Sequence, residues 1–190
     1  MALRHAVLAA LLDGEYSGYQ LAKAFDAGVA HFWHALPQQL YAELTRLEAA
    51  GLVTGREVVQ ETRPNKRLFQ VTDAGLAELE RFAATTAKPS FIRDDLLVKV
   101  QAVDRTGTTA VIEQLDERGR IAAAKAEIFE KLLARLRGGR EEDDFLARGA
   151  RIGPYLTCLR GLAFERETRD WCARTAAVLR ERAAATGQHP

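Results

Sequence analysis

A polar surface between residues 38 and 46 has the residue types that read DNA bases. Leu40, Leu44 and Leu47 recur at intervals of three and four, which places them on one side of a helix. The other side carries Gln38, Gln39, Ala42, Thr45 and Arg46. Glutamine can form two hydrogen bonds with adenine, arginine suits guanine or phosphate, and threonine suits either a base or a phosphate. The segment therefore predicts a helix that presents a base-reading face to a DNA major groove.

A second group of polar residues forms a short basic turn further along the chain. It consists of Arg63, Pro64, Asn65, Lys66 and Arg67. A cationic loop between two strands can reach phosphates or the minor groove. Glu57 and Glu61 lie close by in the sequence and reduce the local positive charge. We therefore expect this turn to add moderate electrostatic attraction for DNA rather than specificity.

Three helices are expected to hold the base-reading face. Apolar residues at helical spacing predict a first helix over residues 2–12. Ser17 can cap a second helix, and Pro37 suits the first position of a third, where its missing N–H has no partner to lose. Because Leu36 is a poor N-cap, we expect an irregular start to this third helix, which Gly51 ends.

The hydrophobic period changes to that of strands after the third helix. Residues 52–59 and 68–71 predict two short strands that the basic turn joins. Thr72 and Asp73 then cap a fourth helix. Three helices, a two-stranded wing and a closing helix are the element order of a winged helix-turn-helix, in which the third helix enters the groove. Residues 1–86 are thus expected to form a DNA-binding domain.

The rest of the chain has helical periodicity alone. It begins after a linker candidate at residues 85–90, and the predicted helices cover residues 92–104, 108–137 and 141–185. Gly138 and Gly139 are expected to form a hinge between the two long helices. Gly153 and Pro154 are expected to kink or break the last one.

The two long helices carry more apolar surface than they can bury by packing against each other. In the last element the apolar residues recur at sevens, as Phe145, Ile152 and Leu159, then Phe164, Trp171 and Val178. Such stripes favour a helical partner, and a second copy of the chain is the simplest one. Residues 91–185 are therefore expected to form an all-helical dimerisation and effector-response domain. The chain as a whole is expected to be mainly α with a small β wing.

Composition limits the partners and the compartment. The net charge of the 190 residues is +1, so any DNA-binding surface must be a local patch. The start of the chain lacks the apolar stretch of a signal peptide, and no uncharged apolar run reaches the ~20 residues that span a bilayer. We therefore expect a cytoplasmic protein that binds double-stranded DNA and does not bind a membrane.

Metal and thiol chemistry have weak candidates. His31 and His34 are three apart, which is a spacing that can place two imidazoles on one metal, but no third ligand is evident. We expect no metal and no cofactor. Cys158 and Cys172 are fourteen apart on one expected helix, so they cannot bridge to each other, and we expect buried, inert thiols.

The remaining alternatives concern small molecules and function class. Trp33 and Trp171 could line an effector cavity, although large aromatic residues are more often part of a core or an interface. The sequence has no Gly-rich phosphate loop, nucleophile elbow or paired acid motif, so we do not expect an enzyme. The alternative to a DNA-binding regulator is a winged-helix module that only assembles proteins.

Several segments resemble the PadR family of transcriptional regulators. Residues 32–53, which include FW and PQQLYAELTRLEAAGLV, resemble the family's Leu-Tyr pair, Arg-Leu-Glu and Gly-Leu-Val. SGYQL at residues 17–21 resembles the family's Gly-Tyr-Glu-Leu, and VTDAG at residues 71–75 matches the junction after the wing. RDDLLVK at residues 93–99 and LRGLAFE at residues 159–165 resemble the longer, virulence-regulator-like C-terminal region.

This resemblance implies a homodimeric regulator that binds an operator through two winged helices. It further implies a repressor that a small-molecule effector releases. In the family, residues that match Tyr19, Tyr41 and the basic wing residues face DNA. The family often carries aromatic residues in the strand after the wing, where this chain has Leu68 and Phe69 and so lacks a hydroxyl.

Overall fold

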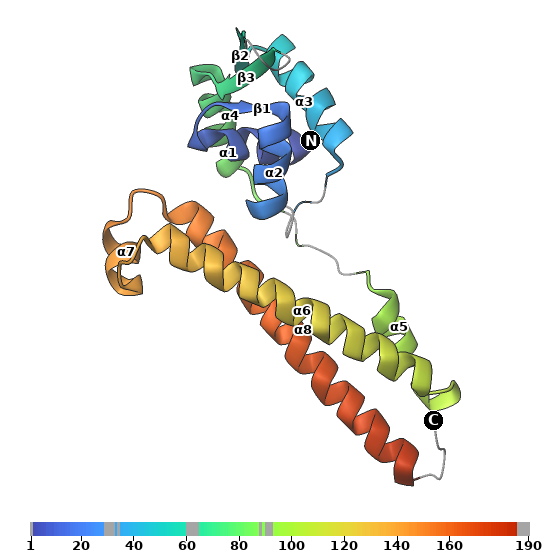
Figure 1. Cartoon of the computed structure of the whole chain (residues 1–190). Helices are drawn as coiled ribbons and strands as arrows, with labels where there is room; N and C mark the ends of the chain where they lie inside the picture. Colours follow the sequence, from blue (N-terminus) through green and yellow to red (C-terminus); the bar gives the residue numbers. More distant parts are fainter. Residues whose placement is uncertain are drawn as a thin grey trace. The chain divides into compact units, whose positions relative to one another are not determined.

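The computed structural model describes residues 2–28, 33, 35–59, 65–87, 89 and 93–185. The chain forms two compact units, Met1–Pro89 and Ser90–Pro190 (Figure 1). The boundary between them falls inside the segment 85–90 that the sequence indicates as a linker. None of the helices in the described part of the chain is long and apolar enough to cross a membrane.

The N-terminal unit has four α-helices and a three-stranded sheet among its described residues. In chain order these are α1 (Ala2–Ala10), the 3₁₀ turn η1 (Leu11–Asp13), β1 (Tyr16–Ser17), α2 (Gly18–Gly28), α3 (Pro37–Ala49), β2 (Val53–Val58), β3 (Lys66–Val71) and α4 (Asp73–Ala83). The sheet is antiparallel with the order β1-β3-β2. The winged helix-turn-helix expected from the sequence is confirmed, and β1 is an addition to it.

Strand β1 places the central strand of the wing against the helical part of the unit. Phe69 of β3 pairs with Tyr16 on one side and with Gly55 of β2 on the other. A strand of two residues is too short to show an alternating pattern, so the sequence does not reveal it. Because β3 has partners on both edges, the wing is continuous with the segment that leads into α2.

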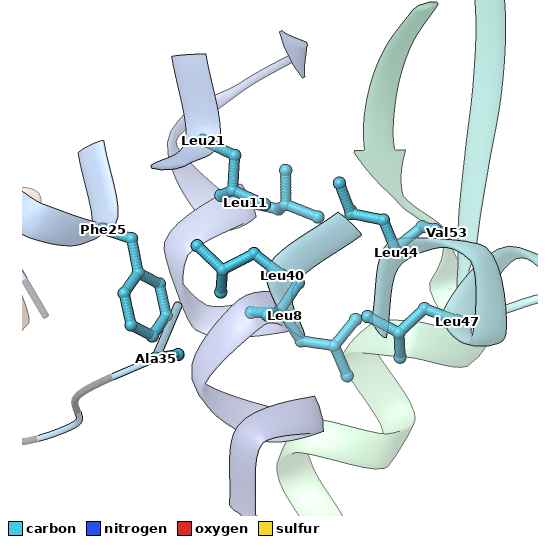
Figure 2. Packing of buried hydrophobic residues seen from close by; sticks show 10 residues of the cluster. Leu8, Leu11, Leu21, Phe25, Ala35, Leu40, Leu44, Leu47 and Val53 are labelled. Atoms are coloured by element: carbon cyan, nitrogen blue, oxygen red, sulfur yellow. The ribbon is translucent and has the colours of Figure 1, made fainter. Parts of the chain in front are cut away.

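The core of this unit is formed by α1, α2 and α3 with the start of β2 (Figure 2). Its buried side chains are Val7, Leu8, Leu11, Leu21, Phe25, Ala35, Leu40, Leu44, Leu47 and Val53. The predicted stripe of three leucines on α3 is thus confirmed as the buried side of that helix. Full burial of one such side chain stabilises the fold by about 1.5–3 kcal/mol.

Local capping fixes where the helices of this unit begin. The Ser17 hydroxyl accepts the N–H of Gln20 at 3.2 Å, and the Ser17 N–H donates to the Gln20 side chain at 3.0 Å, which together form a capping box. At the start of α4 the Thr72 hydroxyl accepts the N–H of Gly75 at 3.2 Å and donates to the carbonyl of Gly51 at 2.7 Å. The expected caps Ser17 and Thr72 are confirmed, whereas Asp73 is the first residue of α4.

The C-terminal unit is helical throughout its described residues. Its elements are α5 (Asp95–Gln101), the 3₁₀ turn η2 (Val103–Arg105), α6 (Thr109–Arg137), α7 (Glu142–Arg148) and α8 (Ile152–Ala185). Helices α6 and α8 lie side by side (Figure 1). Arg166 pairs with Glu130 and Arg180 pairs with Asp116, so the two helices run in opposite directions.

Two helix boundaries in this unit differ from the sequence prediction. The break expected at Gly153 and Pro154 lies earlier in the chain, because residues 149–151 separate α7 from α8. Pro154 instead lies in the first turn of α8, where a proline has no helical hydrogen bond to lose. The helix expected over residues 92–104 is an α-helix followed by the separate turn η2.

The buried side of α8 is not the side that the seven-residue spacing marks. Its buried residues are Tyr155, Cys158, Gly161, Leu162, Glu165, Cys172, Ala176 and Leu179. By contrast, Ile152, Phe164 and Val178 are exposed, and Leu159 and Trp171 are only half-buried. Much of the apolar stripe that the sequence shows therefore faces away from α6 and stays open within a single chain.

Both cysteines are buried and free, as expected. Cys158 belongs to the hydrophobic cluster around Phe129 and Tyr155, whereas Cys172 belongs to the cluster around Leu115. Burial raises the pKa of each thiol. Since the thiolate is the reactive form, this environment suppresses thiol chemistry.

Candidate nucleic-acid interface

Helix α3 divides into a buried and an exposed side as the sequence predicts. The six predicted contact residues of this helix, Gln38, Gln39, Tyr41, Ala42, Thr45 and Arg46, are all exposed. The buried residues are Leu40, Glu43, Leu44 and Leu47. A polar surface on a helix anchored by three buried leucines has the form of a recognition helix.

The start of α3 is regular, so the expected irregularity is wrong. Leu36 is extended, with φ −73° and ψ 148°, which is the conformation that a following proline favours. Its carbonyl accepts the N–H of Gln39 at 2.9 Å, and its N–H donates to Oε1 of Gln39, also at 2.9 Å. Gln39 therefore supplies the half of a capping box in which a side chain accepts the N–H of the N-cap residue, while leucine has no side-chain acceptor for the other half.

Arg46 is held by a carboxylate that the sequence reasoning missed. Its Nη1 lies 3.1 Å from Oε2 of Glu43, one turn earlier on α3. The Glu43 side chain is 10% exposed, whereas that of Arg46 is 70% exposed. Glu43 lies between Leu40 and Leu44 of the buried stripe, and this position in the sequence indicates that its side chain is buried. The pair fixes one end of the guanidinium and leaves the rest of it open to solvent.

Tyr41 and Thr45 have internal contacts as well as exposure. The Thr45 hydroxyl donates to the Tyr41 carbonyl at 3.2 Å. A Cβ atom at Gly18 would lie 2.2 Å from Cε1 of Tyr41, so the tyrosine ring packs directly on the start of α2. Glycine at this position is what permits that approach. Tyr41 thus packs with one part of its ring and exposes another.

Tyr19, at the start of α2, lies on the surface beside a lysine. Its side chain is exposed, and Nζ of Lys23 lies 4.9 Å from the centre of its ring. Hydrogen bonding to Tyr19 raises the pKa of Lys23. Lys23 is a further cation on this helix that the sequence reasoning did not single out, although its spacing of four residues from Tyr19 places both on one side.

Two of the predicted wing residues, Asn65 and Arg67, are bonded to neighbouring acids. Nδ2 of Asn65 donates to Oε1 of Glu57 at 3.1 Å. Nη2 of Arg67 lies 2.6 Å from Oε1 of Glu48 on α3. Lys66 begins β3 and is half-buried. The fourth predicted wing residue, Arg63, lies outside the described residues.

The two tryptophans pack against different cores. Trp33 is half-buried against the core of the N-terminal unit, and Trp171 against the Leu115 cluster of the C-terminal unit. Neither lines the cavity of about 830 Å³ in the C-terminal unit, whose walls come from α5, α6 and α8. The weak metal candidates His31 and His34 lie outside the described residues.

Comparisons with known proteins define the class. The model of the "Transcriptional regulator PadR-like family" matches residues 7–81, and that of "Virulence activator alpha C-term" matches residues 92–180. The probable transcriptional regulator Rv1176c of Mycobacterium tuberculosis is 32% identical over 96% of this chain and 100% of its own length. The negative transcriptional regulator PadR of Bacillus subtilis is 26% identical, with 89% of this chain and 92% of that protein covered.

Solved structures share the fold. Bacillus subtilis PadR in complex with operator DNA has a TM-score of 0.76 at 23% identity, and the alignment covers 94% of this chain and 99% of that one. The Vibrio cholerae virulence activator AphA has a TM-score of 0.68 at 24% identity, with 95% and 99% covered.

The fold and these matches define a DNA-binding transcriptional regulator of the winged-helix class. The chain belongs to the PadR-like family and carries the virulence-activator type of C-terminal region. The resemblance seen in the sequence is confirmed over both halves. This family is one of regulators rather than of enzymes.

Proposed function

We propose that this protein is a homodimeric repressor that reads an operator with the exposed side of α3. The observation that carries the proposal is the polar surface of α3, which projects from a helix whose other side is fixed by buried leucines. A relative of this chain is named a negative transcriptional regulator, and that relative has been solved with operator DNA. Repression in this chain rests on that relationship.

Base reading is assigned to the exposed residues of α3. Gln38, Ala42, Thr45 and Arg46 face outward with side chains that suit major-groove edges. Gln39 retains its amide N–H groups for a contact, while its oxygen is bonded to Leu36. It therefore makes a single contact rather than the two-bond contact with adenine.

Phosphate contacts are assigned to the residues around α3. Helix α2 carries Tyr19 and its neighbour Lys23, and α3 carries Tyr41. The wing carries Asn65 and Lys66. Such contacts position a protein on DNA and carry no sequence information themselves. Arg63 is expected to act with them, while Arg67, which lies on β3, is already paired with Glu48.

Dimerisation is assigned to the C-terminal unit. Ile121 and Ile128 are seven residues apart on α6 and both are exposed. Phe164 of α8 is also exposed, and it lines the same groove as Ile121. Residues seven apart share one side of a helix, so the two isoleucines belong to one exposed apolar surface, to which we also assign Phe164. A second copy of the chain is the partner that would bury it symmetrically.

Effector response is assigned to the groove between α5, α6 and α8. Bacillus subtilis PadR has been solved with p-coumaric acid, which shows that a relative binds a small molecule. In this chain the groove has apolar walls at Ile121 and Phe164 beside the Lys125–Glu165 ion pair, at 3.3 Å. A molecule bound there would touch the dimer surface and could bias the spacing of the two α3 helices. Trp33 and Trp171, which the sequence indicates as possible effector contacts, do not line this groove.

The test is selection of bound DNA from a random library by the full-length protein. A repressor of this kind should enrich a roughly palindromic site and bind it at least about a thousandfold more tightly than shuffled DNA at fixed salt. The enriched site should also occur upstream of the genes that the protein controls. If no sequence is enriched, the alternative of a protein-assembly module becomes the better account.

A further inference from the structure

Arg67 crosses the wing and reaches the recognition helix. It lies on β3, opposite Glu57 of β2, and its Nη2 is 2.6 Å from Oε1 of Glu48 near the end of α3. The carbon at the centre of the guanidinium lies 5.8 Å from the middle of the Phe69 ring. One side chain of the wing is therefore anchored at two points, on its own strand and on α3.

Gly55 makes this path possible. A Cβ atom at Gly55 would lie 2.5 Å from Nε of Arg67 and 2.5 Å from Oε1 of Glu48, and 3.2 Å from Cε1 of Phe69. The ion pair thus rests directly on the backbone of β2, in space that only a glycine leaves open. The chain places a glycine here although strand interiors disfavour it.

The pair is too exposed to be a large source of stability. The Arg67 side chain is 57% exposed and that of Glu48 is 27% exposed, and such pairs add little to folding free energy. What it does fix is geometry, since it ties the start of β3 to the last turn of α3. A guanidinium held in this way is also less available for a DNA phosphate.

We propose that Arg67 is a positioning residue that sets the wing relative to α3, and that it is not a phosphate ligand. Glu48 and Gly55 complete the device. This proposal rests on the proposed function, because it concerns how the wing and α3 bind one DNA site together. It separates Arg67 from Lys66, which the sequence treats as equivalent.

A positioning role and a phosphate-binding role for Arg67 predict different results for three substitutions. If Arg67 positions the wing, then Arg67→Gln, Glu48→Gln and Gly55→Ala each break the device, and each lowers the ratio of cognate to random affinity by about two- to fivefold. If Arg67 binds phosphate, Arg67→Gln weakens binding to all DNA equally and lowers the salt slope by about one. Glu48→Gln and Gly55→Ala would then free the arginine and leave the ratio unchanged.

Gly55→Ala is the most informative variant because it changes no charge. The new methyl group displaces the flexible ends of Arg67 and Glu48, which can move at little cost. Lys66→Gln and Glu57→Gln are the matched controls for the loss of one positive and one negative charge on the same hairpin. These two control substitutions should change the affinity for cognate and random DNA alike and leave the ratio of cognate to random affinity unchanged.

The experiment measures cognate and random affinities of the full-length variants at several salt concentrations, together with amide hydrogen exchange of β2 and β3 without DNA. We expect a lower ratio in all three variants and exchange about two- to fivefold faster in the hairpin. An unchanged ratio in Gly55→Ala and Glu48→Gln overturns the proposal. If the wild-type protein shows no sequence selectivity, the proposed function fails, and unchanged exchange in Gly55→Ala then overturns this proposal separately.

Discussion

Gln39 has a structural task at the surface where the sequence assigns it a reading task. Its side-chain oxygen accepts the N–H of Leu36 and so completes the start of α3. Gln39→Ala should therefore lower the free energy of unfolding by about 0.5–1.5 kcal/mol, the usual value of one net hydrogen bond. Urea titration of the full-length protein measures this change.

Gln38 provides the matched control for that prediction. It is the neighbouring glutamine, it is also exposed, and Gln38→Ala should change stability by less than about 0.5 kcal/mol. Equal effects of the two substitutions would show that the bond to Leu36 contributes nothing.

Single residues also show where sequence reasoning stops. The exposed set on α3 could be predicted because helical spacing alone decides which side each residue occupies. The partners of long polar side chains could not, since the spacing does not say where their ends go. Glu43 beneath Arg46 and Glu48 beside Arg67 are two such partners. Both change what the neighbouring arginine can do.

Among the elements, α5 is linked to α6 in part by Asp94, the residue that caps its start. The Asp94 carboxylate accepts the N–H of Leu96 at 2.9 Å and pairs with the Arg118 guanidinium. The hydrogen bond from Arg118, followed by that from Leu96, lowers the pKa of Asp94. Because the folded pKa lies below the unfolded one, this stabilisation is present above about pH 4 and is lost as the pH falls through the folded value.

The corresponding substitution is Asp94→Asn, which keeps an N-cap and removes the charge. The wild-type protein should be more stable than this variant between about pH 5 and 7, and the difference should shrink below about pH 4. Urea titrations across that range measure it, with Asp95→Asn as the neighbouring control. A difference that stays constant down to the lowest pH would contradict the role of the ion pair.

Most elements could be predicted, and the exceptions have physical causes. The helices and the two wing strands follow from hydrophobic period and from caps such as Ser17 and Thr72. Strand β1 has two residues and so no period. The sequence places the break at Gly153 and Pro154 rather than at residues 149–151, because proline is typical of a helix break although the first turn of a helix also accepts it.

For the whole molecule, the open apolar surface of the C-terminal unit is the feature that needs a partner. Sedimentation of the wild-type protein at micromolar concentration should give about twice the chain mass of 21.0 kDa. Phe164→Glu places a charge on that surface and should shift the protein toward a monomer while its helicity remains. Circular dichroism provides the check on helicity.

Ala177→Glu is the control for this prediction. Ala177 is also exposed on α8, and its position thirteen residues from Phe164 places it on a different side of the helix. It adds the same charge and should leave the dimer intact. A wild-type monomer with intact helices would remove the basis for assigning this surface to dimerisation.

The central claim is that the exposed side of α3 reads bases, and Arg46 tests it most directly against a matched arginine. Arg46 and Arg81 are 70% and 67% exposed, and each pairs with a glutamate three residues earlier, but only Arg46 lies on α3. The measurement is the ratio of cognate to random affinity at fixed salt for Arg46→Gln and Arg81→Gln. Our account predicts that Arg46→Gln lowers this ratio by a factor that corresponds to about 1–3 kcal/mol, whereas Arg81→Gln leaves it unchanged. Equal ratios for the two variants and the wild type would contradict base reading by this residue.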